Sequence, residues 1–255
     1  MLEGLSVLVT GASQGIGRGI ALAAAEAGAA VLATGIDRDG VHKVADEIRA
    51  EGGLAEAVRC DVGDAGEVAA AVARTVALFG KLDSVVHNAT STASSRPVPL
   101  EEIGERDWDD HVAVALRGVL RLGQAALPHL VRARGSFVIL TSASGIEGTA
   151  ALPAYSAVTG AQRGLVRSLA REWGPSGVRV NGVAPSAVTP AVETFLEREP
   201  DMRRHILARA SLARLGDARA DIGRAVAFLI GPGAAFVSGQ TLCVSGGSLM
   251  MGRGA

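Results

Sequence analysis

Short apolar runs alternate with longer segments of helical periodicity along nearly the whole chain. Seven apolar runs predict strands, at residues 5–9, 30–33, 55–59, 84–87, 136–140, 178–183 and 241–244. Six segments between them predict helices, at residues 16–27, 41–50, 65–79, 106–131, 154–173 and 217–230. Continuously apolar strands are typical of a parallel sheet covered on both faces, and the alternation implies right-handed crossovers. The sequence therefore predicts an α/β fold of three layers, a doubly wound parallel sheet of seven strands with helices on both faces.

Length and composition predict a single domain over residues 1–255. Of the 255 residues, 48% are apolar and 20% are charged, which is enough to bury one large core. Residues 186–216 break the rhythm with Pro190, Pro200 and a charged helix-like piece. Open α/β sheets bind ligands beyond the carboxyl ends of their strands, so this segment is a candidate substrate lid. An ordinary packing excursion is the alternative.

Charge and targeting features exclude several kinds of partner. The formal net charge of −1 leaves no polybasic surface for nucleic acid or for an anionic membrane. We expect no secretory signal, because residues 1–4 show no basic region followed by an apolar stretch, and the alanine-rich stretch after Gly19 is too short and too polar to span a bilayer. Cys60 and Cys243 match no metal spacing, and two buried thiols in a reducing compartment are the simplest interpretation. We therefore expect a cytoplasmic protein without a metal site.

A glycine-rich turn follows the first predicted strand and opens the first predicted helix. Its sequence from Thr10 to Gly17 has the spacing G-x-x-x-G-x-G. Glycines at such a junction permit a tight turn and a close approach of phosphate to the backbone, while the helix N-terminus offers free N–H groups. The sequence predicts that this turn binds the pyrophosphate of a dinucleotide. The residues assigned to it are Gly11, Ser13, Gln14, Gly15, Ile16 and Gly17.

Six segments in the right order resemble the classical short-chain dehydrogenase/reductase family over essentially the whole chain. The matching segments are residues 10–17 (T-G-x-x-x-G-x-G), 61–62 (D-V), 87–90 (H-N-A-T), Ser142 with Tyr155, 180–186 followed by 189–190, and 239–241 with 246–247. The resemblance implies a Rossmann fold, a nicotinamide cofactor and a small-molecule substrate. It also implies a homodimer or homotetramer, built through the helix at 106–131 and the helix that bears Tyr155.

The resemblance assigns further contacts with the cofactor. Asp61 and Val62 would meet the adenine ring, and the segment with Pro185 and Thr189 would contact the nicotinamide. The segment with Asn88 and Ala89 would steady the central strand beside the cofactor.

The choice between NAD and NADP stays open. Gly35 occupies the position at which an aspartate would bind the ribose 2′-hydroxyl, so nothing there repels a 2′-phosphate. Arg38 or Arg18 would pair with that phosphate, whereas Asp37 would accept hydrogen bonds from the ribose hydroxyls. A solvated loop is the alternative for all three charged residues.

Tyr155, the only tyrosine of the chain, lies thirteen residues after Ser142. In the family that the chain resembles, this tyrosine gives or takes a proton while hydride passes to or from the nicotinamide, and the serine orients the substrate oxygen. A free phenol has a pKa of about 10, and a nearby cation lowers it, typically by about one to three units. The family supplies that cation from a lysine one helical turn further on.

Thr159 stands in place of that lysine, and the chain departs from the family pattern at three more positions. The relay asparagine of the long helix is Ala115, the last glycine of N-N-A-G is Thr90, and the glycine after the proline is Ser186. These four substitutions surround the expected nicotinamide, whereas the phosphate segment keeps its glycines. The pattern indicates a retained cofactor pocket with altered or lost proton chemistry, in which Thr159 is a weaker contact to the ribose or to a water.

Other charged residues provide alternatives. Arg163 lies one turn beyond Thr159 and is a candidate replacement cation, although a solvent-facing arginine is the simpler interpretation. Arg96 and Glu147 are candidates for binding a charged substrate, or they are loop residues that face water. His111 has no catalytic spacing in the sequence.

Three functions follow. The first is an NAD(P)-dependent oxidoreductase acting on a carbonyl or alcohol, with Ser142, Tyr155 and Thr159 in the catalytic site and with weak or altered activity. The second is a cofactor-binding protein without redox turnover, such as a partner subunit or a sensor. The third is a non-redox enzyme on the same scaffold, a lyase or isomerase. The intact glycines argue against a relative of the halohydrin dehalogenases, which lack that segment.

Overall fold

The computed structural model describes residues 1–94, 96–188 and 200–250. Its centre is one parallel sheet with the strand order β3-β2-β1-β4-β5-β6-β7. The strands are β1 (Ser6–Thr10), β2 (Ala30–Gly35), β3 (Ala55–Arg59), β4 (Ser84–His87), β5 (Ser136–Leu140), β6 (Arg179–Pro185) and β7 (Thr241–Val244). The order grows outward from β1 on one side and from β4 on the other. The predicted doubly wound sheet is confirmed, with every strand boundary within two residues of its prediction.

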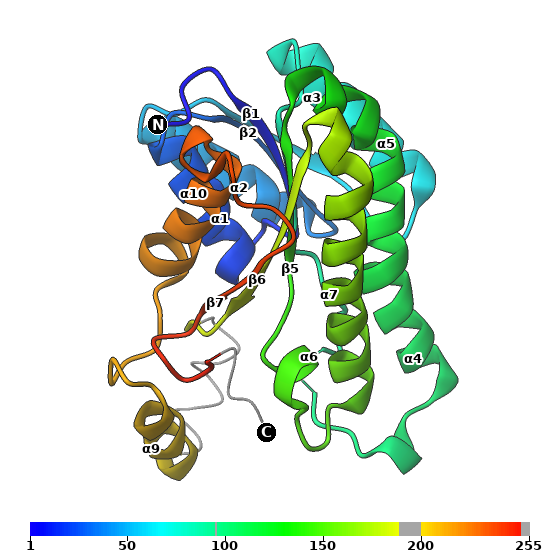
Figure 1. Cartoon of the computed structure of the whole chain (residues 1–255), viewed down its shortest axis with the longest axis vertical. Helices are drawn as coiled ribbons and strands as arrows, with labels where there is room; N and C mark the ends of the chain where they lie inside the picture. Colours follow the sequence, from blue (N-terminus) through cyan, green and yellow to red (C-terminus); the bar gives the residue numbers. More distant parts are fainter. Residues whose placement is uncertain (95, 189–199, 251–255) are drawn as a thin grey trace.

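Helices cover both faces of this sheet (Figure 1). On one face lie α1 (Gly15–Glu26), α2 (Arg38–Ala50) and α10 (Arg224–Ile230), and on the other lie α3 (Ala65–Phe79), α5 (Gly118–Ala133) and α7 (Pro153–Trp173). Successive strand residues point to opposite faces. Val7 and Val9 therefore join the core on the α1 side, whereas Leu8 joins the core on the α5 side. All three are fully buried, as expected for a strand covered twice.

The long helix predicted at 106–131 is divided. It consists of α4 (Glu105–Val112), a π-helical turn (Ala113–Arg117) and α5. Directly after the π turn, Gly118 packs against His87 and Val62: a Cβ on Gly118 would lie 3.0 Å from the His87 ring. The extra residue in the turn lets the backbone approach β4 at this point, and such π turns recur at functional sites.

The segment predicted as a helix at 217–230 is also divided, into a π-helical turn (Ala218–Gly223) and α10. This turn crosses α1 at backbone contact, because a Cβ on Gly19 would lie 2.3 Å from the carbonyl carbon of Ala218. Asp217 caps the turn by accepting hydrogen bonds from the N–H groups of Arg219 (2.8 Å) and Ala220 (2.6 Å). The crossing therefore depends on a glycine in α1, and it fixes the position of that helix.

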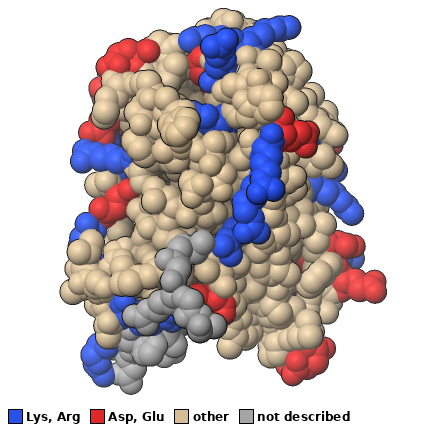
Figure 2. All heavy atoms as spheres, viewed as in Figure 1, with Lys and Arg blue, Asp and Glu red and all other residues tan. Residues whose placement is uncertain are grey.

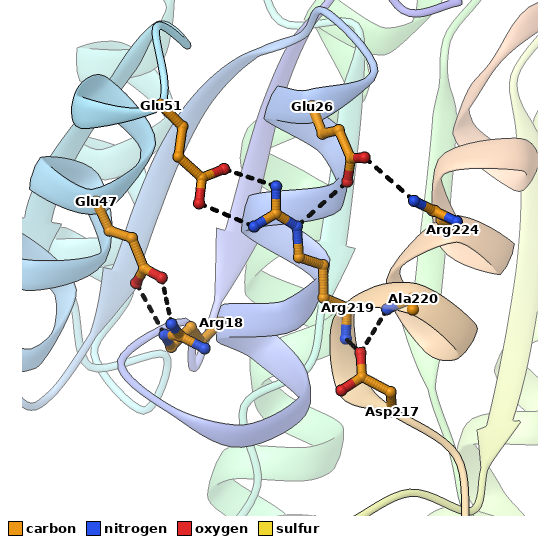
Figure 3. Close-up of polar contacts among 8 residues, drawn as sticks. All are labelled: Arg18, Glu26, Glu47, Glu51, Asp217, Arg219, Ala220 and Arg224. Atoms are coloured by element: carbon orange, nitrogen blue, oxygen red, sulfur yellow. Dashed lines mark hydrogen bonds and ion pairs between the residues drawn. The ribbon is translucent and has the colours of Figure 1, made fainter.

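One arginine clamps three helical elements at this crossing (Figure 3). Arg219 donates two hydrogen bonds to Glu51, at the end of α2, over 2.9 and 2.6 Å. It also donates one to Glu26, at the end of α1, over 3.2 Å. Arg224 donates to the same Glu26 over 3.2 Å. The clamp anchors the carboxyl end of α1 through Glu26. The N-terminus of α1 lies at the other end of the helix, where the glycine turn follows β1.

The carboxyl ends of the strands carry the remaining short elements. After β4 come a 3₁₀ turn (Leu100–Glu102) and α4, after β5 comes α6 (Ser144–Glu147), and α9 (Pro200–Arg209) belongs to the candidate lid. Two further 3₁₀ turns (Gly174–Ser176 and Pro232–Ala234) lie near the opposite edge. Thr189 and Pro190 fall outside the described residues. Among the helices that are described, none is long and apolar enough to cross a membrane.

Candidate active site

A groove of about 540 Å³ runs across the carboxyl ends of the central strands. Three loops line it, namely the glycine turn after β1, the Asp61–Val62 pair after β3 and the Asn88–Ala89 pair after β4. The lining also includes Gly35 and Ile36 at the end of β2. Residues that are far apart in the sequence therefore meet where a doubly wound sheet binds its ligand.

The glycine turn forms a cradle that side chains would fill. Gly11 and Gly15 have φ angles of +62° and +55°, a backbone conformation that favours glycine. A Cβ on Gly17 would lie 2.1 Å from the carbonyl oxygen of Gly11. The turn and the first residues of α1 therefore lie as close together as a bare backbone allows.

The N-terminus of α1 has the features of an anion site. Its N-cap residue, Gln14, makes no capping hydrogen bond through its side chain, and the first turn contains no acidic residue. The first N–H groups of a helix lack partners within that helix, and its dipole places partial positive charge there. A pyrophosphate fits this cradle on geometric and electrostatic grounds.

Asn88 ties the cradle to the central strand. Its side-chain amide donates to the carbonyl oxygens of Thr10 (3.1 Å) and Gly11 (3.0 Å). The Thr10 hydroxyl accepts from the N–H groups of Asn88 and Ala89, each over 3.1 Å. These bonds hold the turn in the shape that its glycines permit.

The charged residues beside the adenosine end of the groove have different partners. Asp37 caps α2 by accepting from the N–H of Gly40 over 3.0 Å. Arg18 forms an ion pair with Glu47 of α2, with its Nε donating over 3.0 Å. Arg38 is exposed at the start of α2. Of the two arginines considered for a 2′-phosphate, Arg18 is engaged and Arg38 extends into solvent.

Tyr155 and Ser142 lie near each other, and neither of them lines the groove itself. Ser142 follows β5, and Tyr155 lies in the first turn of α7, which begins at Pro153. Burial raises the pKa of Tyr155 above the ordinary 10.0, and a hydrogen bond with Ser142 acts in the opposite direction. The Ser142 hydroxyl also accepts from the N–H of Ser144 over 3.1 Å, which fixes its rotamer. The Ser142 hydroxyl therefore lies near enough to the Tyr155 phenol to affect its pKa.

Thr159 directs its hydroxyl into its own helix. The hydroxyl donates to the carbonyl oxygen of Tyr155 over 2.8 Å and lies 3.3 Å from that of Ser156. The side chain is buried, and a Cβ on Gly145 of α6 would lie 2.7 Å from its hydroxyl oxygen. Thr159 therefore closes the packing between α6 and α7, and it brings no charge to Tyr155.

The π turn contains Ala115, at the position where the family resemblance expects an asparagine. The Ala115 carbonyl accepts a hydrogen bond from the side-chain amide of Gln162 on α7 over 3.1 Å. Gln162 is buried, and its own Oε1 has no partner among the described atoms. On the β4 side of the turn, burial lowers the pKa of His87 to about 4, so this imidazole is neutral at pH 7. Two neutral polar residues, Gln162 and His87, therefore flank the turn at Ala115.

Three charged residues near Tyr155, namely Arg96, Glu147 and Arg163, have partners within the protein. Arg96 pairs with Asp107 of α4 over 2.6 Å, and Glu147 of α6 pairs with Arg209 of α9 over 3.0 Å. Arg163 donates to the carbonyl oxygen of Gly145 over 3.2 Å. It is half-buried and holds α6, so the interpretation of Arg163 as a solvent-facing residue was wrong.

The sequence analysis missed His111. This residue is 6% exposed, and its ring centroid lies 6.4 Å from that of Tyr155. The signal was present in the sequence: His111 is four residues after Asp107 and four before Ala115, so all three lie near one face of the long helix. Most of the predicted neighbours of the cofactor come together in the groove. Asp37, Arg38 and Pro185 do not line it, and Thr189 lies outside the described residues.

The fold and the groove together define a class. This is a parallel α/β protein with a dinucleotide cradle at the carboxyl ends of its strands and a serine–tyrosine pair beside it.

Comparison with known proteins agrees with this class. A family model described as enoyl-(acyl carrier protein) reductase matches residues 11–248. The chain is 38% identical to the 3-oxoacyl-[acyl-carrier-protein] reductase FabG of Staphylococcus aureus over 248 residues, which cover 96% of this chain and 98% of the relative. It is 33% identical to the 7alpha-hydroxysteroid dehydrogenase of Escherichia coli over 250 residues, covering 97% and 95% of the two chains. The structure of the 3-ketoacyl-(acyl-carrier-protein) reductase from Brucella melitensis complexed with NADH matches with a TM-score of 0.89 and 31% identity, covering 97% and 99%.

The chain therefore belongs to the short-chain dehydrogenase/reductase family of oxidoreductases, which use NAD or NADP. The resemblance found in the sequence is confirmed.

Proposed function

We propose that this protein transfers hydride between a nicotinamide cofactor and a carbonyl or alcohol substrate, with Tyr155 as the proton donor or acceptor and Ser142 orienting the substrate oxygen. The observation that carries the proposal is that the Ser142 hydroxyl acts to lower the pKa of the buried Tyr155 phenol, in a protein whose glycine cradle fits pyrophosphate. The bound cofactor would supply or accept the hydride. The backbone of Gly11, Gly15 and Gly17 would hold its phosphates.

The proton step is the unusual part. In the direction of reduction, Tyr155 transfers its hydroxyl proton to the substrate oxygen and becomes a phenolate. Burial disfavours that phenolate, because it raises the pKa of Tyr155. Thr159 cannot offset the cost by charge, since its hydroxyl is neutral and donates to the carbonyl of Tyr155. Removal of one electrostatic partner commonly costs about 10²–10³ in turnover, so slow reduction is the expected behaviour.

The substrate is expected to be neutral. The two residues considered for a charged substrate, Arg96 and Glu147, are each neutralised by an ion pair within the protein. NADP is the expected cofactor, because Gly35 presents no carboxylate to a 2′-phosphate and Arg38 is exposed beside it.

The remaining parts of the proposal concern organisation. The chain works as one domain over residues 1–255, with residues 186–216 as the substrate lid, and it assembles as a homodimer or homotetramer. Leu120 of α5 is 56% exposed, an apolar residue on a helix that would join the interface. The formal net charge of −1 supports a small-molecule substrate rather than nucleic acid or a membrane. On the face drawn in Figure 2, acidic and basic side chains are interspersed, and one column of basic side chains near α7 is the exception.

A second candidate function is cofactor binding without redox turnover. The observation that favours it is again Thr159, which places a neutral, internally bonded hydroxyl where a cation would assist Tyr155.

One experiment separates the candidates. Calorimetric titration with NADPH and NADH measures binding, and the loss of nicotinamide absorbance with a panel of neutral ketones measures turnover. We expect NADPH to bind, slow turnover to be measurable, and Tyr155→Phe to lower kcat by roughly 10²-fold or more with the cofactor Kd unchanged. Tight binding without turnover by the wild type would support the second candidate. No binding of either cofactor would refute both.

A further inference from the structure

One fully buried side chain, His87, lies between two walls of the cofactor groove. The glycine turn after β1 forms one wall, and the π turn contributes to another through Val114. His87 is the last residue of β4 and has no exposed surface. A buried polar group without a partner costs about 1–3 kcal/mol, so the surroundings of the two ring nitrogens indicate what this imidazole does.

The Thr10 hydroxyl fixes the tautomer of His87. This hydroxyl accepts two hydrogen bonds, from the N–H groups of Asn88 and Ala89, each over 3.1 Å. A hydroxyl has two acceptor positions and one proton. Because both acceptor positions are used, the proton is left for Nδ1 of His87, which lies 3.3 Å from the hydroxyl oxygen. Nδ1 is accordingly the acceptor, and the neutral ring carries its proton on Nε2.

The other side of the ring faces the π turn. A Cβ on Gly118, directly after the turn, would lie 3.0 Å from Cε1 of His87, the carbon between the two nitrogens. Burial lowers the pKa of His87, and the backbone carbonyls of Ala115 and Val114 act in the opposite direction. Nε2 has no hydrogen bond of ordinary geometry within the described part of the chain. These two carbonyls are therefore the acceptors that the π turn offers to its proton.

Both contacts of the ring lead to parts of the groove that the cofactor would occupy. On the cradle side, Asn88 follows His87 in the chain, and its amide holds the carbonyl of Gly11 over 3.0 Å. On the other side, a Cβ on Gly118 would also lie 3.1 Å from Cγ2 of Val62, which lines the groove where the adenine ring is expected. One imidazole thus adjoins the support of the cradle and the support of the Val62 wall.

We propose that His87 is a positioning residue for the cofactor: as the Nε2–H tautomer it joins the glycine cradle to the π turn and sets the width of the groove around the adenosine and the pyrophosphate. A binding site keeps its geometry when the residues that support it are held by hydrogen bonds of their own. The inference goes beyond the proposed function, because it concerns cofactor binding and does not depend on the proton step at Tyr155.

The first test determines the tautomer in the wild-type protein. The ring nitrogens of the five histidines are recorded by ¹⁵N NMR, and the signals of His87 are those that disappear when this residue is substituted. We expect a protonated Nε2 and an unprotonated Nδ1 near pH 7. A proton on Nδ1 would overturn the proposal, because Thr10 would then have no acceptor for its own proton in this ring.

Three substitutions separate the two contacts. His87→Asn places an amide near the position of Nδ1 and is too short to reach the π turn, so it keeps the contact with Thr10 alone. His87→Gln extends to the position of Nε2 and keeps the contact with the π turn alone, whereas His87→Leu removes both. The measurement is calorimetry with ADP-ribose, which contains the adenosine and the pyrophosphate but no nicotinamide. We expect its Kd to rise roughly fivefold in each amide variant and roughly twenty-five-fold in the leucine variant, the value of one and of two hydrogen bonds.

Val72→Ala is the matched control for lost stability. Val72 is a buried core residue of α3 and does not line the groove, so its truncation should destabilise the fold and leave the Kd of ADP-ribose unchanged. If His87→Leu and Val72→Ala lose similar stability and bind ADP-ribose equally well, His87 only packs and the proposal is wrong.

The ligand separates this proposal from the proposed function. If the His87 variants lose affinity for ADP-ribose as expected but the wild type reduces no ketone, the proposed function fails and the role of His87 stands. If the wild type turns over a ketone and its affinity for ADP-ribose survives in His87→Leu, the role of His87 alone is overturned.

Discussion

Replacing Thr159 by lysine is the most direct test of the proton chemistry. Tyr155 and residue 159 are one helical turn apart on α7, where side chains lie about 5–6 Å from each other. At that separation and an effective dielectric constant of about 20, a cation stabilises the phenolate by about 3 kcal/mol, or about two pH units. We therefore expect Thr159→Lys to lower the pKa of Tyr155 by about two units from its raised value.

The chain offers an unusually clean assay for this shift. Tyr155 is the only tyrosine, so the ultraviolet absorbance of tyrosinate during a pH titration reports on this one residue. Thr159→Met is the matched control, because its side chain approaches lysine in length and carries no charge. The Thr159 hydroxyl packs closely against Gly145, and neither lysine nor methionine can reproduce this packing. Both variants should therefore lose some stability. Only the lysine should move the pKa of Tyr155.

The same variants read out activity. A phenol whose pKa is closer to neutral transfers its proton more readily, so kcat should rise in Thr159→Lys by roughly tenfold or more and stay unchanged in Thr159→Met. If the lysine variant is folded and the pKa of Tyr155 equals that of the methionine variant, the electrostatic reasoning is refuted. If the pKa falls but kcat does not rise, the wild type already has another route for its proton.

Three further predictions concern other parts of the molecule. Because His87 has a folded-state pKa of about 4 against 6.5 unfolded, the unfolded chain binds the proton first, and the free energy of unfolding should fall by about 3 kcal/mol as the pH drops from 6.5 to below 4. Urea titrations check this, and His87→Asn should remove most of that pH dependence. Gly17→Ala should weaken cofactor binding by at least about tenfold in calorimetry, because its Cβ would lie 2.1 Å from the Gly11 carbonyl; unchanged affinity would contradict the cradle. Gly35→Asp should favour NADH over NADPH by roughly tenfold relative to the wild type, and an unaltered ratio of kcat/KM would show that the ribose lies elsewhere.

Most of the fold was predictable because its signals are local. The strands of the central sheet are continuously apolar, and the glycine turn after β1 has one plausible use at that junction. The strands 84–87 and 136–140 were predicted at their observed boundaries, because Asp83 directly precedes the first run and Gly135 directly precedes the second. The pyrophosphate cradle was predictable for the same reason, since Gly11, Gly15 and Gly17 act through their own backbones.

The catalytic end was less predictable because its properties arise from tertiary contacts. The π turn at Ala113–Arg117 does not interrupt the helical periodicity, so the sequence predicted one continuous helix. Its cause, the close packing of Gly118 on β4, is visible only in three dimensions. His111 has an ordinary helical spacing in the sequence. Its proximity to the ring of Tyr155, forty-four positions away, is visible only in the structure. Arg163 looked solvent-facing on the helix, yet it bonds to α6.

The substitutions at the catalytic end form a packed unit, which limits how they can be reversed. Ala115 is 3% exposed, and its carbonyl accepts from the buried amide of Gln162. An asparagine at 115 therefore enters space that is already filled, and overpacking of this kind typically costs about 1–3 kcal/mol. Restoring lysine at 159 does not by itself make room for it, since Gln162 approaches the π turn from the next turn of α7.

This packing predicts strong coupling between residues 115 and 162. Gln162→Ala alone removes a donor from the Ala115 carbonyl and should cost about 1–3 kcal/mol of unfolding free energy. In the double variant Ala115→Asn with Gln162→Ala, the new amide occupies the volume that the glutamine leaves. The sum of the single losses should therefore exceed the loss of the double variant by about 0.5–3 kcal/mol in urea titrations. Additivity within about 0.5 kcal/mol would mean that the two side chains do not share this space. Coupling would instead identify Gln162 as the residue that must change, with Thr159 and Ala115, before a conventional proton relay can return.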